Sequence, residues 1–243
     1  MKRLICMRWA CAAAGAWLLA GAGRASAATI SFGPDTEGPY KALTDNPGSG
    51  SFTLPQFDTL GGARVLTGVT VEVIIDSFGG KAEFDNQSAT GGPITLSIGS
   101  SVRVKGPASP SQVVVIPLAI TTASSTITGT TGDFPADFAG TDYFFVNGLD
   151  LSDTKSASRT SAGDLAPYIG AGNVTFAWDL AGLSTAGQDT SAFDSGSFRA
   201  SETTFYFHTT VHYDFVPEPA SLGLLIPGIL LLLRRRVRGP RWD

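Results

Sequence analysis

Cysteine and histidine are scarce in this sequence. Its two cysteines, Cys6 and Cys11, both lie close to the N-terminus, so residues 28–243 offer no disulfide, thiol nucleophile or thiolate metal ligand. The only histidines are His208 and His212. On a strand, two positions four apart are separated by roughly 13 Å, whereas zinc ligands lie about 2 Å from the metal. The two histidines therefore cannot share one zinc ion, and we interpret them as polar residues on the solvent face of a strand.

Catalytic motifs and long helical patterns are missing as well. No serine stands in a G-x-S-x-G sequence, so the nucleophile elbow of an α/β-hydrolase is absent. Chain order alone does not exclude a Ser-His-Asp triad, but no sequence feature places a serine beside either histidine. No long stretch after the N-terminal segment repeats apolar residues at helical spacing with caps, and residues 164–170 have room for one helical turn at most. The sequence predicts a noncatalytic protein.

Positive charge is scarce between the two ends of the chain. Residues 28–219 contain eight basic and twenty acidic residues, a balance of −12, whereas the whole chain carries −4. Such an acidic segment would repel the phosphates of nucleic acid, which we exclude as a partner. Divalent cations and neutral glycans stay candidates, and the charge is also explained by the solubility that an exported protein needs. The length suits one domain with a sizeable core.

The N-terminus has the pattern of a secretory signal peptide. Basic residues come first, the apolar stretch Trp9–Ala22 follows, and Ala25 and Ala27 supply the small residues that signal peptidase reads. The basic residues are Lys2, Arg3 and Arg8. We predict that residues 1–27 are removed by cleavage before Ala28.

The segment that follows is predicted to be all-β. Apolar and polar residues alternate over Thr203–Phe215, Ile94–Lys105 and Val65–Ile75, as in strands with one buried face. Gly-, Asn-, Asp- and Pro-containing stretches separate the strands, and we interpret residues 44–51, 77–86 and 89–93 as turns. Strands with one polar face favour antiparallel sheets. We therefore predict a single antiparallel β-sandwich, jelly-roll or Ig-like, over residues 28–215.

Aspartate is concentrated in one Gly-containing stretch of this domain. Asp133, Asp137 and Asp142 lie in GDFPADFAGTDY, and aspartate outnumbers glutamate by 16 to 5 over the chain. Carboxylates on such loops can gather oxygen ligands for calcium, so these three are candidate calcium ligands, although they do not match an EF-hand. Aspartate also favours turns through its own backbone bonding, which is the alternative explanation. A glycosidase would need two carboxylates in one cleft, a hypothesis that the sequence leaves open.

The C-terminal residues 216–243 form a separate segment. Pro217, Glu218 and Pro219 precede the apolar run Ala220–Leu233, which ends at a basic cluster, Arg234, Arg235 and Arg236. Fourteen helical residues span about 21 Å, against a hydrocarbon core of about 30 Å, so the run predicts a short helix that is marginal as a permanent anchor. The arginines place that end on the cytoplasmic side of the membrane.

Two resemblances follow from these residues. The Pro-Glu-Pro motif, the apolar run and the arginines, together with the signal peptide, resemble a PEP-CTERM sorting signal, which implies processing by a membrane-bound exosortase. FTLPQFDTLGGARVLTGVTVEV, Phe52–Val73, is similar to the choice-of-anchor E domain of bacterial surface proteins, with Leu54-Pro55-Gln56-Phe57-Asp58 carrying its Leu-Pro-x-Phe-Asp motif. This second resemblance implies surface display and no known enzymatic activity.

From these observations we expect an exported, noncatalytic protein of the cell surface or of an extracellular (biofilm) matrix. Signal peptidase and exosortase are the expected partners, with residues 220–233 holding the domain at the inner membrane, on its periplasmic side, before release. An extracellular carbohydrate-binding adhesion module, calcium-dependent or not, is the second hypothesis, with aromatics such as Tyr206 or the loop aspartates contacting the sugar. A glycan-active hydrolase is the third. No cofactor is expected, unless calcium binds.

Overall fold

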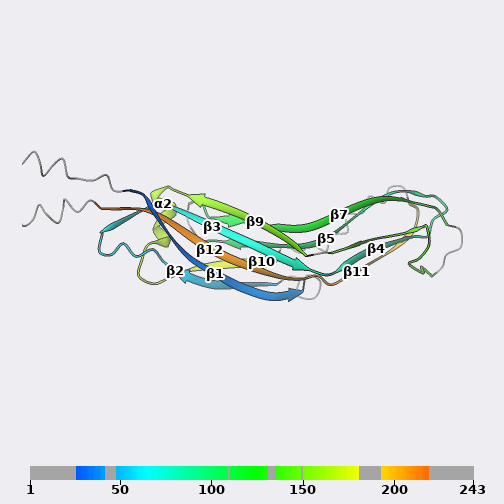
Figure 1. Ribbon diagram of the computed structural model, residues 1–243, viewed down its shortest axis with the longest axis horizontal. Coiled ribbons are helices and arrows are strands. Elements are labelled where there is room, and N and C mark those ends of the chain that lie inside the picture. The colour runs from blue at the N-terminus through cyan, green and yellow to red at the C-terminus, as the bar shows by residue number, and fades with distance from the viewer. Residues whose placement is uncertain are drawn as a thin grey trace, which may run out of the picture. The chain divides into compact units, whose positions relative to one another are not determined.

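The computed structural model describes residues 26–41, 48–108, 110–130, 135–148, 150–180 and 193–218. The chain divides into a larger unit, Thr29–Asp58 with Leu66–Asp214, and a smaller unit that includes Thr59–Val65 and the described residues after Asp214. The larger unit holds the sandwich (Figure 1). The two end segments, 1–25 and 219–243, lie outside the described residues, so the predicted signal peptide and C-terminal helix are not part of this description.

The described residues form an all-β fold, which confirms the predicted antiparallel sandwich. The four-stranded sheet has the order β1-β12-β3-β9, a second sheet has the order β2-β10-β5-β6 with β7 also paired to β5, and the three-stranded sheet has the order β11-β4-β8. The strands are β1 (Ala28–Lys41), β2 (Ser49–Pro55), β3 (Arg64–Phe78), β4 (Lys81–Asn86), β5 (Gly92–Lys105), β6 (Val114–Val115), β7 (Leu118–Ile127), β8 (Tyr143–Asn147), β9 (Leu151–Arg159), β10 (Asn173–Leu180), β11 (Gly196–Ser201) and β12 (Thr204–Pro217). The choice between jelly-roll and Ig-like topology stays a prediction.

An aromatic core lies between the four-stranded sheet and the sheet that contains β10. The predicted alternation of β12 is realised, because its phenylalanines, Val211 and Tyr213 are buried while the residues between them are partly exposed. Phe207 packs edge-on against Trp178 of β10, with ring centroids 5.4 Å apart. Phe52 of β2 and Phe176 of β10 stack at 5.3 Å. Each of these rings buries a large apolar area, and ring pairs at these distances attract one another.

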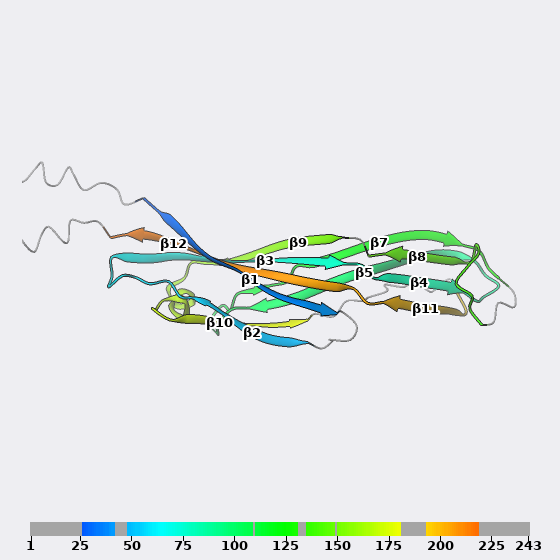
Figure 2. The ribbon, with the colours of Figure 1, turned by 60° about the horizontal axis from the view of Figure 1, so that its bottom comes forward.

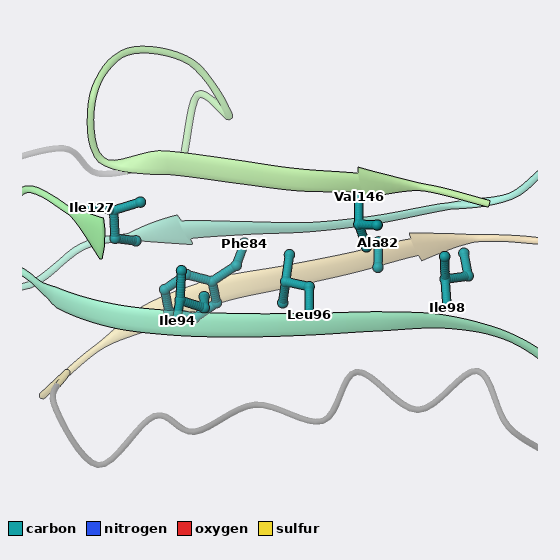
Figure 3. Packing of buried hydrophobic residues seen from close by; sticks show 7 residues of the cluster. All are labelled: Ala82, Phe84, Ile94, Leu96, Ile98, Ile127 and Val146. Carbon is teal, nitrogen blue, oxygen red and sulfur yellow. The ribbon is translucent and has the colours of Figure 1, made fainter. Parts of the chain in front are cut away.

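A second, largely aliphatic core lies between the three-stranded sheet and the strands β5 and β7. Its buried residues are Ala82, Phe84, Ile94, Leu96, Ile98, Ile127 and Val146 (Figure 3). Because side chains alternate along a strand, burying Ala82 and Phe84 turns Lys81, Glu83 and Asp85 to the opposite face of β4. This second core therefore determines which residues the three-stranded sheet presents on its outer face.

Strand β5 contributes to both cores. Ile94, Leu96 and Ile98 pack in the aliphatic core, whereas Val102 and Val104 are buried farther along the same face. Ser100 lies between the two groups and is buried, with its hydroxyl 3.2 Å from that of Ser77 at the end of β3. This buried hydroxyl pair marks the place where one core gives way to the other.

All three predicted turns overlap strands, because β2 begins at Ser49 and β5 at Gly92, and the segment 77–86 is mostly strand. Residues 77–86 were expected to form a turn, but β3 continues to Phe78 and β4 begins at Lys81. Gly79 and Gly80, with positive φ values of 68° and 83°, make the connection alone. This short link lets the chain leave the four-stranded sheet and enter the three-stranded one, and Figure 2 shows β4 beyond the end of β3.

Among the described residues, helical structure is limited to one short segment, which overlaps the helical turn predicted at residues 164–170. Helix α2 spans Ala162–Leu165 and the 3-10 helix η1 spans Ala166–Tyr168. Ser161 caps α2, and its hydroxyl donates a hydrogen bond of 2.6 Å to Asp164. No helix in the described part of the chain is long and apolar enough to cross a membrane.

The smaller unit has a tight turn at residues 59–64. Leu60, Gly61 and Gly62 all have positive φ, and the backbone N–H groups of Gly62 and Arg64 both donate to the carbonyl of Thr59 at 3.1 Å. The guanidinium of Arg64 lies 5.2 Å from the ring centroid of Phe215. Leu60 is about half exposed, at 52%.

Candidate functional site

The outer face of the three-stranded sheet gathers side chains from three segments far apart in the sequence. In the register of the sheet, Glu83 of β4 stands directly between Phe145 of β8 and Arg199 of β11. Lys81 and Tyr143 lie on the same face, two residues from Glu83 and Phe145 respectively. We call these residues and Phe138 the outer-face cluster.

Glu83 is the centre of the outer-face cluster. Its side chain is only 8% exposed and accepts hydrogen bonds from Arg199 Nε at Oε2 and from Arg199 Nη2 at Oε1, the latter 3.1 Å long. Tyr143 also donates its hydroxyl proton to Oε1, and Lys81 Nζ lies 2.5 Å from that oxygen. Lys81 donates a further hydrogen bond of 2.8 Å to the Tyr143 hydroxyl. One buried carboxylate thus holds two cations and a phenol in place.

The electrostatics of the outer-face cluster follow from these contacts. Hydrogen bonding by Arg199 lowers the pKa of Glu83 from its ordinary 4.5 to about 2, with Lys81 and Tyr143 adding to the effect against the cost of burial. The bond to Glu83 in turn raises the pKa of Lys81 and of Arg199. Burial raises the pKa of Tyr143. At neutral pH the cluster therefore contains two cations, one carboxylate and a neutral phenol.

Aromatic rings surround the two cations. The Arg199 guanidinium lies 3.9 Å from the ring centroid of Phe138, and Lys81 Nζ lies 4.5 Å from that of Phe145. Tyr143 and Phe145 stack at 5.6 Å with an interplanar angle of 24°. Phe145 is 43% exposed although it is a large apolar residue. The cluster therefore presents ring surface and cationic donors side by side.

The environment of Glu83 does not favour proton transfer by this carboxyl at neutral pH. A carboxyl with a pKa of about 2 is ionised at neutral pH and cannot serve there as a general acid. Both of its oxygens already accept hydrogen bonds, which leaves it poorly placed as a base. Arg199 and Lys81, by contrast, retain donor protons that can reach a ligand.

The predicted calcium ligands are only partly brought together. Asp133 lies outside the described residues, so its position relative to the others is not part of the structure. Asp137 Oδ1 accepts a hydrogen bond of 2.8 Å from the N–H of Ala139, the turn bonding expected of an aspartate in a loop. The backbone carbonyl of Asp142 accepts a hydrogen bond of 2.9 Å from Asn86. In the described ranges, no three acidic, histidine or cysteine side chains form a group that could hold a metal ion.

Asp85 is a buried acid in the same region that sequence reasoning missed. It is fully buried, its Oδ2 accepts a hydrogen bond of 2.7 Å from the N–H of Phe138, and its Oδ1 has no partner among the described residues. Burial raises the pKa of Asp85, and the charges of Asp142 and Asp137 raise it further. Asp85 therefore fixes the loop over one end of the outer-face cluster.

The two histidines each contact a hydroxyl of strand β1. His208 Nδ1 lies 2.9 Å from Thr36 Oγ1 and its Nε2 lies 3.2 Å from Asp76 Oδ2, while His212 Nδ1 lies 2.7 Å from Ser31 Oγ. Sequence reasoning placed no hydroxyl beside either histidine. The Thr36–His208–Asp76 contacts cross three neighbouring strands of the four-stranded sheet, with the histidine and aspartate side chains about 30% exposed. We interpret them as cross-strand bonds of a solvated face.

The predicted processing residues lie where the described strands begin and end. Ala25 is outside the described residues, Ala27 precedes the first strand, and Ala28 begins β1. At the other end Pro217 is the last residue of β12, and the N–H of Glu218 donates a hydrogen bond of 2.9 Å to the carbonyl of Ala63. The remaining residues of the sorting motif, Pro219 and Arg234–Arg236, lie outside the described residues.

The residues of the outer-face cluster were not identified from the sequence. One signal was present: in KAEFD, residues 81–85, charged residues alternate with Ala82 and Phe84, which is the pattern of a strand with a charged outer face. YFFVN, residues 143–147, is a short aromatic strand pattern. Nothing in either pattern shows that the two segments pair with each other and with Arg199.

Comparison with known proteins identifies no family. No family model matches the chain, and no curated protein matches its sequence. Among solved structures, a CocE/NonD family hydrolase from Staphylococcus aureus has 8% identity and a TM-score of 0.17 over 79% of this chain and 33% of the other. A structure of botulinum neurotoxin type C, described with its interaction with two ganglioside molecules, gives 9% identity and a TM-score of 0.20 over 83% and 46%. A structure of infectious bursal disease virus, strain Gx, has 10% identity and a TM-score of 0.15 over 88% of this chain and 49% of the other.

This chain thus spans a third to about half of the length of those solved chains. The TM-scores are too low to relate its fold or function to theirs.

Proposed function

We propose that the protein is an exported, noncatalytic component of the cell surface or extracellular matrix, cut at both ends during export. The observation that carries the proposal is the position of the strands relative to the predicted cleavage sites. The first described strand begins at Ala28 and the last ends at Pro217. Cleavage before Ala28 by signal peptidase and near Pro217-Glu218-Pro219 by an exosortase would therefore leave every described strand in the product.

The charge distribution supports the same proposal. Nine of the seventeen basic residues lie outside residues 28–219, so processing would convert a chain of charge −4 into an acidic product. Arginines at the end of the apolar run hold that end in the cytoplasm, which directs the sandwich to the periplasmic side of the inner membrane. A run of fourteen residues is marginal as a lasting anchor but sufficient to hold the chain until it is cut.

Intact-mass spectrometry of the mature protein tests this proposal. The full chain would be expressed in a bacterium that encodes an exosortase, and the expected product begins at Ala28 and ends at or near Pro219. Glu218→Gln is expected to leave the tail uncut and the protein in the membrane fraction. Glu72→Gln removes the same charge from β3 and is the control. Recovery of a mature wild-type chain that still ends at Asp243 would contradict the proposal.

A second candidate function is binding of extracellular polysaccharide, and the outer-face cluster favours it. A half-exposed phenylalanine beside Tyr143 and two ordered cations is an arrangement that can hold a sugar ring through its apolar face and its oxygens. Binding to a glycan array, with and without a chelator, measures both the activity and any need for calcium. Absence of binding under both conditions would exclude this candidate.

A hydrolase is the third candidate and has the least support. Glu83 is held ionised by Arg199, so it lacks the proton that a glycosidase acid must give. We therefore propose that the protein binds without cleaving. The release of reducing ends from any bound glycan would overturn this.

A further inference from the structure

We propose that the outer-face cluster binds an anionic polysaccharide whose sugar rings carry carboxylates, that is, a polyuronate. This inference rests on the second candidate function, glycan binding, and names the class of glycan and the residues that hold it. The cluster comprises Lys81, Glu83, Phe138, Tyr143, Phe145 and Arg199. None of these residues is part of the predicted sorting or calcium sites.

The rings supply a surface for the apolar face of a sugar. Phe145 and Tyr143 lie two residues apart on the edge strand β8, and their rings are close to parallel at 24°. A pyranose presents C–H bonds on one face, and the electron-rich face of an aromatic ring attracts them. Because Phe145 is 43% exposed and its exposed part lies on an edge strand, a chain of sugars can reach it without displacing any described strand.

The polar groups of the cluster offer donors to a ligand and almost no acceptors. Glu83 uses both carboxylate oxygens within the cluster, and the Tyr143 hydroxyl donates to Glu83 while accepting from Lys81. Arg199 donates its Nε proton and one Nη2 proton to Glu83. Its Nη1 has no hydrogen-bond partner in the described part of the chain. Lys81 has three protons and two partners. A matching ligand must therefore supply acceptors.

Charge selects a carboxylate among the possible acceptors. With Glu83 ionised, Lys81, Arg199 and Glu83 together carry one net positive charge. The Asp85 carboxyl on the same face of β4 is fully buried and accepts a hydrogen bond from the N–H of Phe138, so a ligand meets the two cations and not this acid. A hydrogen bond from a guanidinium or ammonium group to a carboxylate is about twice as strong as one between neutral groups. Hydroxyl oxygens of a neutral sugar gain less from the same donors. The acidic charge of the surrounding domain opposes every polyanion, so binding depends on these charge-assisted bonds at the cluster.

The rigidity of the cluster favours binding as well. Arg199 is fixed by two bonds to a buried carboxylate and by the Phe138 ring, although its side chain is 54% exposed. A free surface arginine would lose its rotamer freedom when it bound a ligand, and that loss opposes binding. Here the side chain is already ordered, so less freedom is lost.

The test is a binding titration of the mature protein, which begins at Ala28, purified after processing of the full chain. Four polymers distinguish the possible specificities: polygalacturonate, its highly methyl-esterified form, neutral dextran and polyglutamate. We expect polygalacturonate to bind, with affinity falling at high salt. The esterified form and dextran are each expected to bind about tenfold more weakly, the factor that the loss of one charge-assisted bond gives.

Three variants assign the binding to the outer-face cluster. Phe145→Ala removes an exposed ring without touching the bonds to Glu83, so it should fold normally and bind about tenfold more weakly. Arg199→Lys keeps the charge but loses the fork of donors, and should weaken polygalacturonate more than dextran. Lys155→Gln removes an exposed cation from β9 and is the control, with binding unchanged.

The binding results distinguish failure of the polyuronate proposal from failure of glycan binding, the function on which it rests. Equal binding of the esterified and free polymers would overturn the inference while leaving glycan binding intact. Equal binding of polyglutamate would show attraction by charge alone and would overturn both. Loss of binding in Lys155→Gln but not in Phe145→Ala would place the site elsewhere, and no binding of any polymer would overturn both proposals.

Discussion

The outer faces of the four-stranded and three-stranded sheets are built in different ways. The first carries pairs in which a hydroxyl contacts a hydroxyl or an imidazole, such as Thr70 with Ser158 at 2.8 Å and Ser31 with His212 at 2.7 Å. The second carries a buried carboxylate bound to two cations and flanked by rings. Losing one partner of an exposed hydroxyl pair changes the free energy of unfolding little, because water can take its place. A buried charge costs several kcal/mol unless it is fully paired, so only the second face commits the protein to a particular arrangement of charges.

Removing the carboxylate should have the largest effect on stability. Glu83→Gln keeps the size of the side chain but loses the charge that Arg199 and Lys81 surround. The lowering of the Glu83 pKa from 4.5 to about 2 corresponds to about 3 kcal/mol, which we expect the variant to lose at pH 7 in urea unfolding. A stability loss no larger than that from removing a hydroxyl pair would show that the two outer faces do not differ in this way.

The difference in stability between wild type and Glu83→Gln should depend on pH in a defined direction. A carboxyl with a lowered pKa stabilises the fold fully above its unfolded value, and the contribution is lost as the pH falls through the folded value. Wild type should therefore lose its advantage over Glu83→Gln between about pH 4.5 and pH 2. A difference that stays constant over that range would show that Glu83 acts through packing and not through charge.

The link between the two sheets gives the next largest effect. In Gly80→Ala the new Cβ would collide with Thr203 Oγ1 and lie 2.9 Å from Ile98 Cδ1, at a φ of +83°. We expect a loss of about 2 kcal/mol in thermal or urea unfolding. Gly79→Ala is a matched control, because its φ is +68° but nothing lies within 4 Å of its Cβ, and it should lose only about 1 kcal/mol. Equal losses would mean that the contact at Gly80 is unimportant.

Asp85→Asn should change stability less than the preceding variants and should raise it. Burial raises the pKa of Asp85, so the folded state disfavours the ionised form that neutral pH imposes. An amide keeps an oxygen for the N–H of Phe138 and removes the charge. The melting temperature should rise at pH 7, and the gain should disappear at acidic pH, where the wild-type carboxyl is protonated. A lower melting temperature at pH 7 would contradict this.

The hydroxyl pairs of the four-stranded sheet should matter least. Thr70→Val removes one partner of Ser158 at an exposed position and keeps the β-branched shape. We expect a change within about 0.5 kcal/mol, measured by urea unfolding beside Glu83→Gln. A loss close to that of Glu83→Gln would erase the distinction between the two faces.

Much of the fold could be predicted from the sequence, because alternation is a local signal. The patterns at Val65–Ile75, Ile94–Lys105 and Thr203–Phe215 correspond to β3, β5 and β12. Strand β4 was missed because Gly79-Gly80 precede it directly and its own last two residues, Asp85 and Asn86, favour turns. Local composition indicated a turn there, whereas pairing with two distant strands makes it the centre of a sheet.

The outer-face cluster could not be predicted for a related reason. Lys81, Tyr143 and Arg199 come from three segments that are separated by more than fifty residues each. Their meeting depends on the register of β4 with both β8 and β11, and a shift of one residue would turn each of them to the other face. The calcium hypothesis, by contrast, used residues close together in sequence, and the described ones serve at least in part as turn residues.

We propose that the three-stranded sheet has the binding face and that the outer face of the four-stranded sheet is solvated. Affinity electrophoresis in a gel containing polygalacturonate tests it with two matched ring deletions. Phe145→Ala removes a partly exposed ring from the first face, and Tyr206→Ala removes a partly exposed ring from the second. Retardation is expected to be lost in Phe145→Ala and unchanged in Tyr206→Ala. Loss in Tyr206→Ala with normal retardation of Phe145→Ala would contradict it.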